Sequence, residues 1–163
     1  MTGYSMQSIP HDQLHTFIVR AKAATYVGSG QKLLPYRLDS HDLQFFDGDW
    51  AYHDSYLGES DFIGQEAVYY QGRAVWAMNY YGRILNPGRI TSAQAGAMIR
   101  ASLTRLYAEG RFLGGFELSE GELTYVDTNQ GDPEFFTGRE WISREEEVVY
   151  ELVYHGGLIR SAG

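Results

Sequence analysis

Apolar and polar residues alternate along most of this chain, and a period of two is typical of strands. The turn signals Asp47-Gly48 and Glu120-Gly121 each separate two such segments, and a further hairpin is predicted about Gln71-Gly72-Arg73. The sequence therefore predicts antiparallel strands at Leu43–Phe46, Asp49–Leu57, Gln65–Tyr70, Ala74–Arg83, Gly115–Leu118, Glu122–Asp127, Arg139–Ser143 and Glu147–His155.

The spacing becomes helical in two places. Between His11 and Tyr26 the core-facing positions recur every three or four residues, and the glycines from Gly28 to Gly30 break this pattern. Thr91 and Gln94 match a capping box at the start of a second helix, which is predicted to reach about Ala108. The predicted core stripe of the first helix is Leu14, Phe17, Ile18, Ala21 and Thr25.

One pattern occurs twice along the chain. Its first copy contains Gly48-Asp49-Trp50-x-Tyr52-x-Asp54, Phe62-x-Gly64-x-Glu66 and Trp76-x-Met78-x-Tyr80-x-Gly82. Its second copy contains Gly121-Glu122-Leu123-x-Tyr125-x-Asp127, Phe136-x-Gly138-x-Glu140 and Tyr150-x-Leu152-x-Tyr154-x-Gly156. We therefore predict one α+β domain over residues 1–163, in which a helix-plus-four-antiparallel-strands unit is duplicated, at about 11–86 and 90–160, with pseudo-two-fold symmetry.

Strand parity assigns the repeated residues to one face. A face that is rich in large apolar groups in both copies is expected to be the inner one, which turns Asp54, Glu66, Asp127 and Glu140 inward among aromatic rings. Buried carboxylates need partners. Either each acid holds its own hairpin together, or the acids and rings line a central cavity suited to a small cationic or amphipathic ligand.

The second interpretation names a set of ligand-binding residues in which acids meet positive charge and rings supply stacking area. They are Trp50, Tyr52, Glu66, Trp76, Tyr80, Glu140, Tyr150 and Tyr154. Positions that differ between the copies include Asn79, Tyr81 and His155, which have the opposite parity. They fit either a solvated sheet surface or a subunit contact in a homodimer.

Composition restricts the classes of function. The 163 residues include no Cys, which excludes thiol nucleophiles, disulfides and Cys-based zinc sites. A net charge of −8 and the lack of any Lys/Arg cluster disfavour direct nucleic-acid binding. Neither a signal peptide nor an apolar run long enough for a membrane span is present, so a soluble cytoplasmic protein is expected.

Evidence for enzymatic chemistry is weak, and no cofactor is predicted. Asp47, Asp49 and His53 share a strand face, but their spacing matches no zinc or calcium signature and is more typical of a solvated edge. We therefore favour a non-enzymatic binding domain. The first alternative is a structural or dimerisation domain, and the second is a hydrolase that uses Glu66 or a metal held by His53 and Asp54.

Four longer strings occur in one order along the chain: Gly48-Asp49-Trp50-Ala51-Tyr52-His53-Asp54-Ser55-Tyr56-Leu57-Gly58, Phe62-Ile63-Gly64-Gln65-Glu66, Trp76-Ala77-Met78-Asn79-Tyr80-Tyr81-Gly82 and Tyr150-Glu151-Leu152-Val153-Tyr154-His155-Gly156-Gly157-Leu158-Ile159. Through them the chain resembles, from about Leu14 to Ile159, a bacterial domain family of unknown function. Its members occur alone or after a repressor-type helix-turn-helix DNA-binding domain. The resemblance implies a sensor or dimerisation unit and assigns no catalytic or binding residue.

Overall fold

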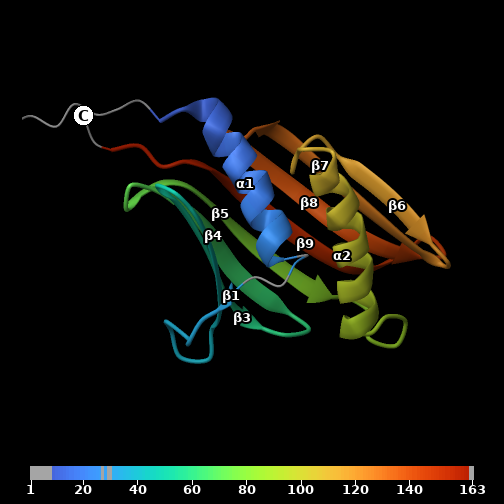
Figure 1. The fold of residues 1–163 in the computed structure, drawn as a ribbon. Helices are drawn as coiled ribbons and strands as arrows, with labels where there is room; N and C mark the ends of the chain where they lie inside the picture. Colours follow the sequence, from blue (N-terminus) through green and yellow to red (C-terminus); the bar gives the residue numbers. More distant parts are fainter. Residues whose placement is uncertain (1–8, 27, 29–30, 162–163) are drawn as a thin grey trace, which may run out of the picture.

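The computed structural model describes residues 9–26, 28 and 31–161, within which it has two helices and nine strands. Helices α1 (His11–Thr25) and α2 (Ser92–Ala108) lie side by side on one face of a curved antiparallel sheet (Figure 1). The strands are β1 (Gln31–Lys32), β2 (His41–Asp47), β3 (Trp50–Gly58), β4 (Phe62–Tyr70), β5 (Arg73–Ile84), β6 (Phe116–Glu120), β7 (Leu123–Asp132), β8 (Phe135–Arg144) and β9 (Glu147–Leu158).

The order of strands in the sheet is β1-β2-β3-β4-β5-β9-β8-β7-β6. Neighbours in sequence therefore pair as hairpins on each side, and the long strands β5 and β9 join the two sides at the centre. Tyr80 of β5 lies directly opposite Tyr154 of β9. The α+β class with an antiparallel sheet is confirmed.

The predicted helices are confirmed almost residue for residue, but several strands are longer than predicted. β4 begins at Phe62 rather than Gln65, and β8 begins at Phe135 rather than Arg139. Both ladders continue through a glycine, Gly64 in β4 and Gly138 in β8, although glycine generally weakens a strand interior. The predicted helix break at 28–30 lies mostly outside the described residues.

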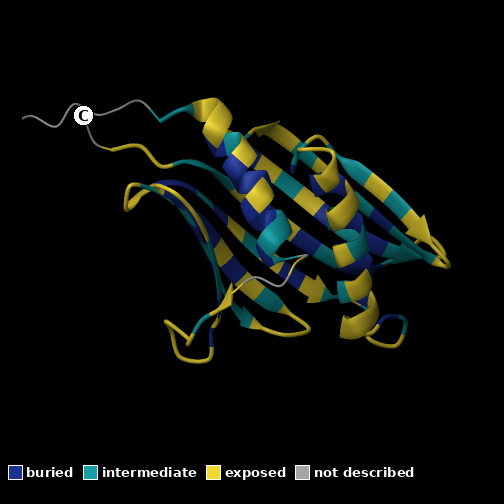
Figure 2. Cartoon of the chain, viewed as in Figure 1, coloured by how far each residue is buried: buried dark blue, intermediate teal, exposed yellow. Residues whose placement is uncertain are grey.

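The core lies between the helices and the sheet (Figure 2). All five predicted stripe residues of α1 are buried, and the predicted capping box of α2 is present, with the Thr91 hydroxyl accepting from the Gln94 N–H. Trp50 stacks on Phe17 of α1, with ring centroids 5.4 Å apart. Trp76 stacks on Phe136 at 5.8 Å. The first contact holds α1 on the sheet, and the second joins β5 to β8 within the sheet.

The opposite face of the sheet carries no helix in the described part of the chain. Asn79, Tyr81 and His155 lie there and are exposed or half-exposed, as their parity predicted. Phe46, Ile63 and Val153 are exposed large apolar residues. The predicted dimer surface at this face stays a prediction. Neither described helix has the length and apolar character that crossing a membrane requires.

Candidate functional site

Four carboxylates lie on the inner face of the sheet, which the helices cover, as strand parity predicted. Asp54 is 3%, Glu66 5%, Asp127 4% and Glu140 6% exposed. Asp54 lies opposite Glu66 on β3 and β4, and Asp127 lies opposite Glu140 on β7 and β8. Directly opposed side chains of an antiparallel pair share one face and lie close together. The site therefore consists of two acidic pairs, one from each side of the sheet.

Each of the four carboxylates accepts a hydrogen bond from a tyrosine hydroxyl. Tyr80 Oη donates to Asp54 Oδ1 at 2.7 Å, and Tyr154 Oη donates to Asp127 Oδ1 at 2.8 Å. In addition, Tyr52 donates to Glu66, and Tyr125 and Tyr150 donate to the two oxygens of Glu140. Burial raises the pKa of the Tyr80 and Tyr125 hydroxyls well above the ordinary value, so these groups stay protonated and act as donors.

Two strand glycines make room for two of these tyrosines. Gly64 lies opposite Tyr80 in the β4–β5 ladder, and Gly138 lies opposite Tyr154 in the β8–β9 ladder. A Cβ atom at either glycine would overlap the facing tyrosine ring. The missing side chain thus lets each ring lie across its neighbouring strand and reach an aspartate.

The substitution Gly138→Ala is expected to push Tyr154 away from Asp127 and to lower the free energy of unfolding by about 1–3 kcal/mol, because overpacking forces side chains off their rotamers. The measurement is urea unfolding. Gly96→Ala is the matched control, since its Cβ would meet only the flexible Arg100 guanidinium on α2. The control is expected to be neutral or slightly stabilising. Equal stability of Gly138→Ala and the wild type would contradict this role of Gly138.

Lys22 of α1 brings a positive charge to one acidic pair. Its Nζ donates to Glu66 Oε2 at 2.6 Å and to Met78 Sδ at 3.3 Å, and it lies 5.5 Å from the centre of the Phe112 ring. Lys22 is 5% exposed. Because both ends of this ion pair are removed from water, the pair depends on its geometry and on the additional hydrogen bond from Tyr52.

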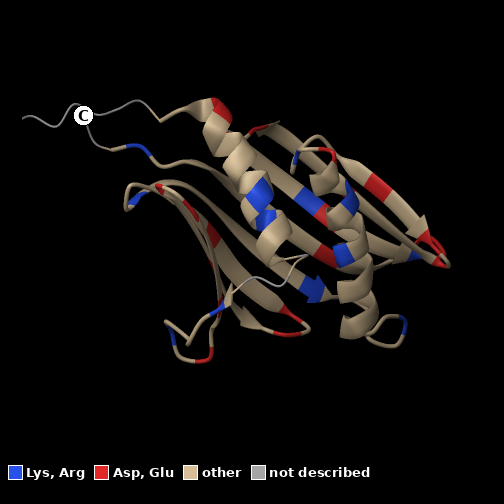
Figure 3. Ribbon diagram, in the orientation of Figure 1, with Lys and Arg blue, Asp and Glu red and all other residues tan. Residues whose placement is uncertain are grey.

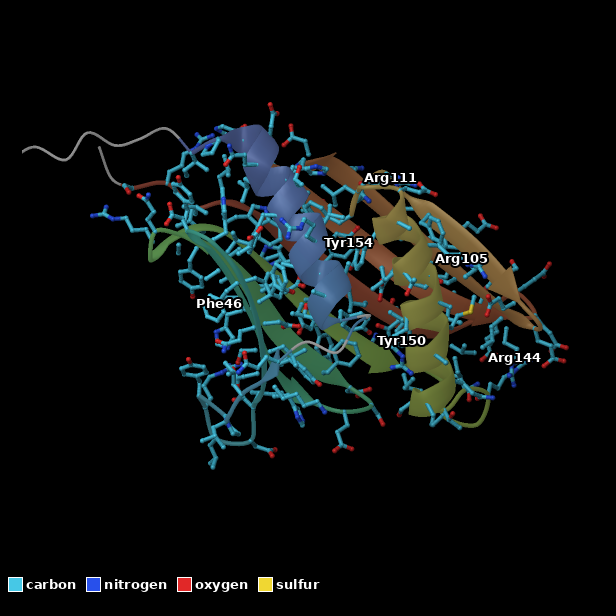
Figure 4. All side chains as sticks on the ribbon, in the orientation of Figure 1. Phe46, Arg105, Arg111, Arg144, Tyr150 and Tyr154 are labelled. Carbon is cyan, nitrogen blue, oxygen red and sulfur yellow. The ribbon has the colours of Figure 1, made fainter. Side chains whose placement is uncertain are left out.

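The acidic pairs line a common cavity of about 90 Å³. At roughly 30 Å³ each, about three water molecules would fill it. All four carboxylates, Lys22 and five tyrosines line it, and the remainder of its wall is apolar. The tyrosines are Tyr26, Tyr80, Tyr107, Tyr125 and Tyr154, and the other residues are Phe62, Met78, Ile99, Leu103, Phe112 and Leu152. Figure 4 shows Tyr150 and Tyr154 on β9 beneath the helices.

A larger groove adjoins this cavity. It measures about 530 Å³ in the described part of the chain and runs between the β3–β4 hairpin and the first half of α2. Its wall shares Tyr26, Asp54, Phe62, Tyr80 and Ile99 with the inner cavity. The acidic interior is therefore continuous with a larger outer space, whose wall combines apolar side chains with charged ones.

Three of the buried acids hold their protons unusually tightly. Burial raises the pKa of Glu140 from 4.5 to about 7, and hydrogen bonds from Tyr125 and Tyr150 offset only part of this rise. Burial raises the pKa of Asp54 from 3.8 to about 7, with a further contribution from the charge on Glu66. Burial also raises the pKa of Asp127, from 3.8 to about 6. Burial therefore opposes the ionisation of these three groups, and Lys22 is the one lysine among the described residues that line the cavity.

Comparison with protein-family models gave one result, a match of residues 54–159 to the family described as a domain of unknown function, DUF5680. The match covers more than half of the 163 residues. The chain belongs to the DUF5680 family. No curated protein and no solved structure matched the chain. The matched part of the DUF5680 domain contains all four buried carboxylates, whereas Lys22 lies before it.

The DUF5680 domain brings together half of the ligand-binding residues predicted from sequence. Glu66, Tyr80, Glu140 and Tyr154 line the cavity. The remaining four, Trp50, Tyr52, Trp76 and Tyr150, do not line it. Tyr52 and Tyr150 contribute hydroxyls to the two glutamates, and Tyr150 also lines the outer groove. Trp50 and Trp76 pack in the core, where the Trp76 indole N–H donates to the Pro133 carbonyl.

The polar residues predicted on one face of β3 and its hairpin, which lie before the region matched to DUF5680, have separate partners. Asp47 pairs with Arg20, Asp49 accepts from Gln71, and His53 Nε2 lies 2.9 Å from Asp42 Oδ1. Within the described residues, no three His, Asp or Glu side chains converge in a way that could hold a metal ion. Lys and Arg residues are scattered along the helices, strands and loops (Figure 3).

Proposed function

We propose that this DUF5680 domain is a non-enzymatic binding domain whose inner cavity takes a small cationic or amphipathic molecule. The observation that carries the proposal is the charge imbalance of the cavity. Four buried carboxylates line it, and Lys22 is the one basic side chain among the described lining residues. A buried cation would satisfy acids whose ionisation is otherwise opposed by burial.

The shape of the site supports a ligand with two different ends. About 90 Å³ is enough for a small cationic head, and the adjoining groove of about 530 Å³ has room for a larger apolar part. Aromatic faces such as those of Tyr80 and Tyr154 attract cations through their π electrons. The inner cavity therefore suits the head and the groove suits the tail.

We further propose that the site arose by internal duplication, with the pseudo-two-fold axis at the Tyr80–Tyr154 pair. The structure supports this in its details. The ladder irregularities lie at matching places, after Val68 in one half and after Ile142 in the other. Two acidic pairs, one from each copy, would then face one cavity.

The sequence resembles domains that occur alone or after a helix-turn-helix DNA-binding domain, and a sensor role agrees with this resemblance. In this role, ligand binding in the cavity would change the activity of a separate DNA-binding partner. This acidic chain itself would not contact nucleic acid. The net charge of −8 supports this role, because a strongly acidic chain is unsuited to binding nucleic acid directly.

The proposal is tested by thermal unfolding of the wild type and of Glu140→Gln in the presence of a panel of organic cations. The panel contains n-butylammonium, tetramethylammonium and spermidine. At a hundredfold excess over Kd, a ligand that binds only the folded state stabilises by about 2.7 kcal/mol. For a chain of this size we expect a rise in Tm of about 5–10 °C.

Glu140→Gln keeps the shape of the side chain and removes its charge, so it is expected to abolish most of the shift. Glu117→Gln is the matched control, because Glu117 is exposed and lies outside the cavity. If no cation of the panel raises Tm, or if the rise is the same in Glu140→Gln, the proposed function is wrong.

A further inference from the structure

The two helices present the same pattern to the cavity, with one difference. Ile18-x3-Lys22-x3-Tyr26, which ends on the residue that caps α1, corresponds to Ile99-x3-Leu103-x3-Tyr107 of α2. Lys22 and Leu103 both line the cavity, and in each helix the tyrosine four residues later lines it as well. Residues four apart on a helix share one face. Leu103 therefore holds on α2 the place that Lys22 holds on α1.

The contacts of Lys22 show how this cavity can bind an alkylammonium group. Its Nζ bonds to Glu66 Oε2 at 2.6 Å, with Met78 Sδ at 3.3 Å and the Phe112 ring beside it. Its four-carbon stem is buried together with the charge. The first half of the cavity is thus filled by a primary ammonium group that belongs to the chain itself.

The second half has the same acids but no ammonium group bonded to them among the described residues, although the charge of Lys22 lowers the pKa of both Glu140 and Asp127, and that of Arg111 lowers the pKa of Asp127. Glu140 faces Asp127 across the ladder as Glu66 faces Asp54, and Leu152 lies opposite Glu140 as Met78 lies opposite Glu66. Among the described residues, Glu140 receives only the neutral hydroxyls of Tyr125 and Tyr150. The uncharged Leu103 side chain offers it no ammonium group.

We infer that the second half of the cavity binds a primary ammonium group on an unbranched alkyl stem, supplied by the ligand and seated at Glu140 and Asp127. This inference rests on the proposed function and specifies the chemical class of its ligand. An ammonium group has three N–H donors for carboxylate and carbonyl oxygens, whereas a quaternary ammonium has none. The narrow cavity of about 90 Å³ also favours the smaller head.

The outer groove meets the cavity at Asp54, Phe62 and Tyr80 of the first half and at Ile99 of α2. Ile99 of α2 lies one helical turn before Leu103 and belongs to the walls of both the cavity and the outer groove. The groove continues along Ala95 and Ile84. An alkyl chain leaving Glu140 would cross the cavity past Ile99 and enter a groove that has both apolar side chains, such as Ile84, and charged ones, such as Arg100.

The decisive experiment is Leu103→Lys, which places a second internal ammonium where the ligand is expected. Binding of n-butylammonium at pH 7.5 is measured by isothermal titration calorimetry. We expect at least a tenfold loss of affinity in Leu103→Lys, while the matched control Leu103→Met, which has an unbranched and uncharged stem, keeps its affinity within about threefold. Circular dichroism and the cooperativity of thermal unfolding report whether each variant is folded.

Ligand selectivity of the wild type gives a second test that does not depend on how Leu103→Lys folds. We expect n-butylammonium to bind at least tenfold more tightly than tetramethylammonium or n-butanol. Equal binding of n-butylammonium by a folded Leu103→Lys variant, or equal binding of the quaternary cation by the wild type, would overturn this inference. Glu140-dependent binding of tetramethylammonium alone would leave the proposed function standing, whereas no binding of any cation would reject both.

Discussion

Replacing Lys22 with methionine is expected to lower the free energy of unfolding by about 3–5 kcal/mol, because it leaves the buried Glu66 carboxylate without its counter-ion. Methionine keeps most of the apolar stem, so the loss reports the charge rather than the packing. In a chain whose total stability is of the order of 5–15 kcal/mol, this is a large fraction. The measurement is urea unfolding at pH 7.5.

A control on the same helix distinguishes the effect of losing a buried ion pair from that of losing an exposed one. Arg20 pairs with Asp47 at 2.5 Å, but both side chains are about half exposed. Surface pairs of this kind contribute about 0–1 kcal/mol, so Arg20→Met is expected to have a small effect. If Lys22→Met were no more destabilising than Arg20→Met, the Lys22–Glu66 pair would not be the buried ion pair that the geometry describes.

The double variant Lys22→Met with Glu66→Gln is expected to recover much of the loss, since the uncompensated carboxylate is then absent and the amide still accepts from Tyr52. Residues in direct contact commonly show interaction energies of about 0.5–3 kcal/mol. Strict additivity of the two single substitutions would show that the two side chains act independently, contrary to their 2.6 Å contact.

The second large effect concerns pH. The free energy of unfolding is expected to fall as pH rises from 5 to 7.5. Burial raises the pKa of Glu140 and Asp54 to about 7 and that of Asp127 to about 6. In this window the folded chain binds more protons than the unfolded chain, whose carboxyls have already ionised, and stability then decreases with pH.

The size of the effect follows from the shift in pKa. For Glu140, a change from 4.5 to about 7 corresponds to about 2.4 kcal/mol between the two ends of the window. Carboxylates with a lowered pKa, such as Asp42 and Glu151, act in the opposite direction but only at lower pH, where carboxyls ordinarily titrate. They do not cancel the effect between pH 5 and 7.5.

Urea unfolding at pH 5, 6 and 7.5 checks this prediction, with Glu140→Gln as the informative variant. The fall in the free energy of unfolding from pH 5 to 7.5 is expected to be about 2.4 kcal/mol smaller in Glu140→Gln than in the wild type, while Glu117→Gln follows the wild type. A bound ammonium ion stabilises the ionised acids, so an excess of n-butylammonium is expected to weaken the pH dependence as well. Wild-type stability that rises from pH 5 to 7.5 would contradict the raised pKa values.

Strand parity predicted the most informative feature of the site from sequence. The alternation in Trp50-x-Tyr52-x-Asp54 and its second copy turned four acids inward, and all four are buried. Lys22 was missed, although a signal was present, since a lysine stood inside the apolar stripe between Ala21 and Thr25. Tyr26, Tyr107 and Phe112 were also missed, because they approach the acids from elements whose packing the sequence pattern does not reveal.

The tryptophans show the opposite error. Trp50 and Trp76 share the parity of the cavity residues, which placed them among the predicted ligand-binding residues. Trp50 instead packs against Phe17 and Tyr70, and Trp76 packs against Phe112 and Phe136. Parity selects a face of the sheet but does not say where along a strand the helices leave a space and where they fill it.

By itself, the sequence determined the elements, their turns and the face on which each carboxylate lies, since these depend on neighbouring residues and on the period of the backbone. Only the tertiary structure decided that β5 pairs with β9, and that α1 contacts β2 and β3 on one side of this junction while α2 contacts β6 and β7 on the other. That pairing joins segments far apart in the chain, and no local period encodes it. Through it, two separate acidic hairpins came to share one cavity that contains a single lysine.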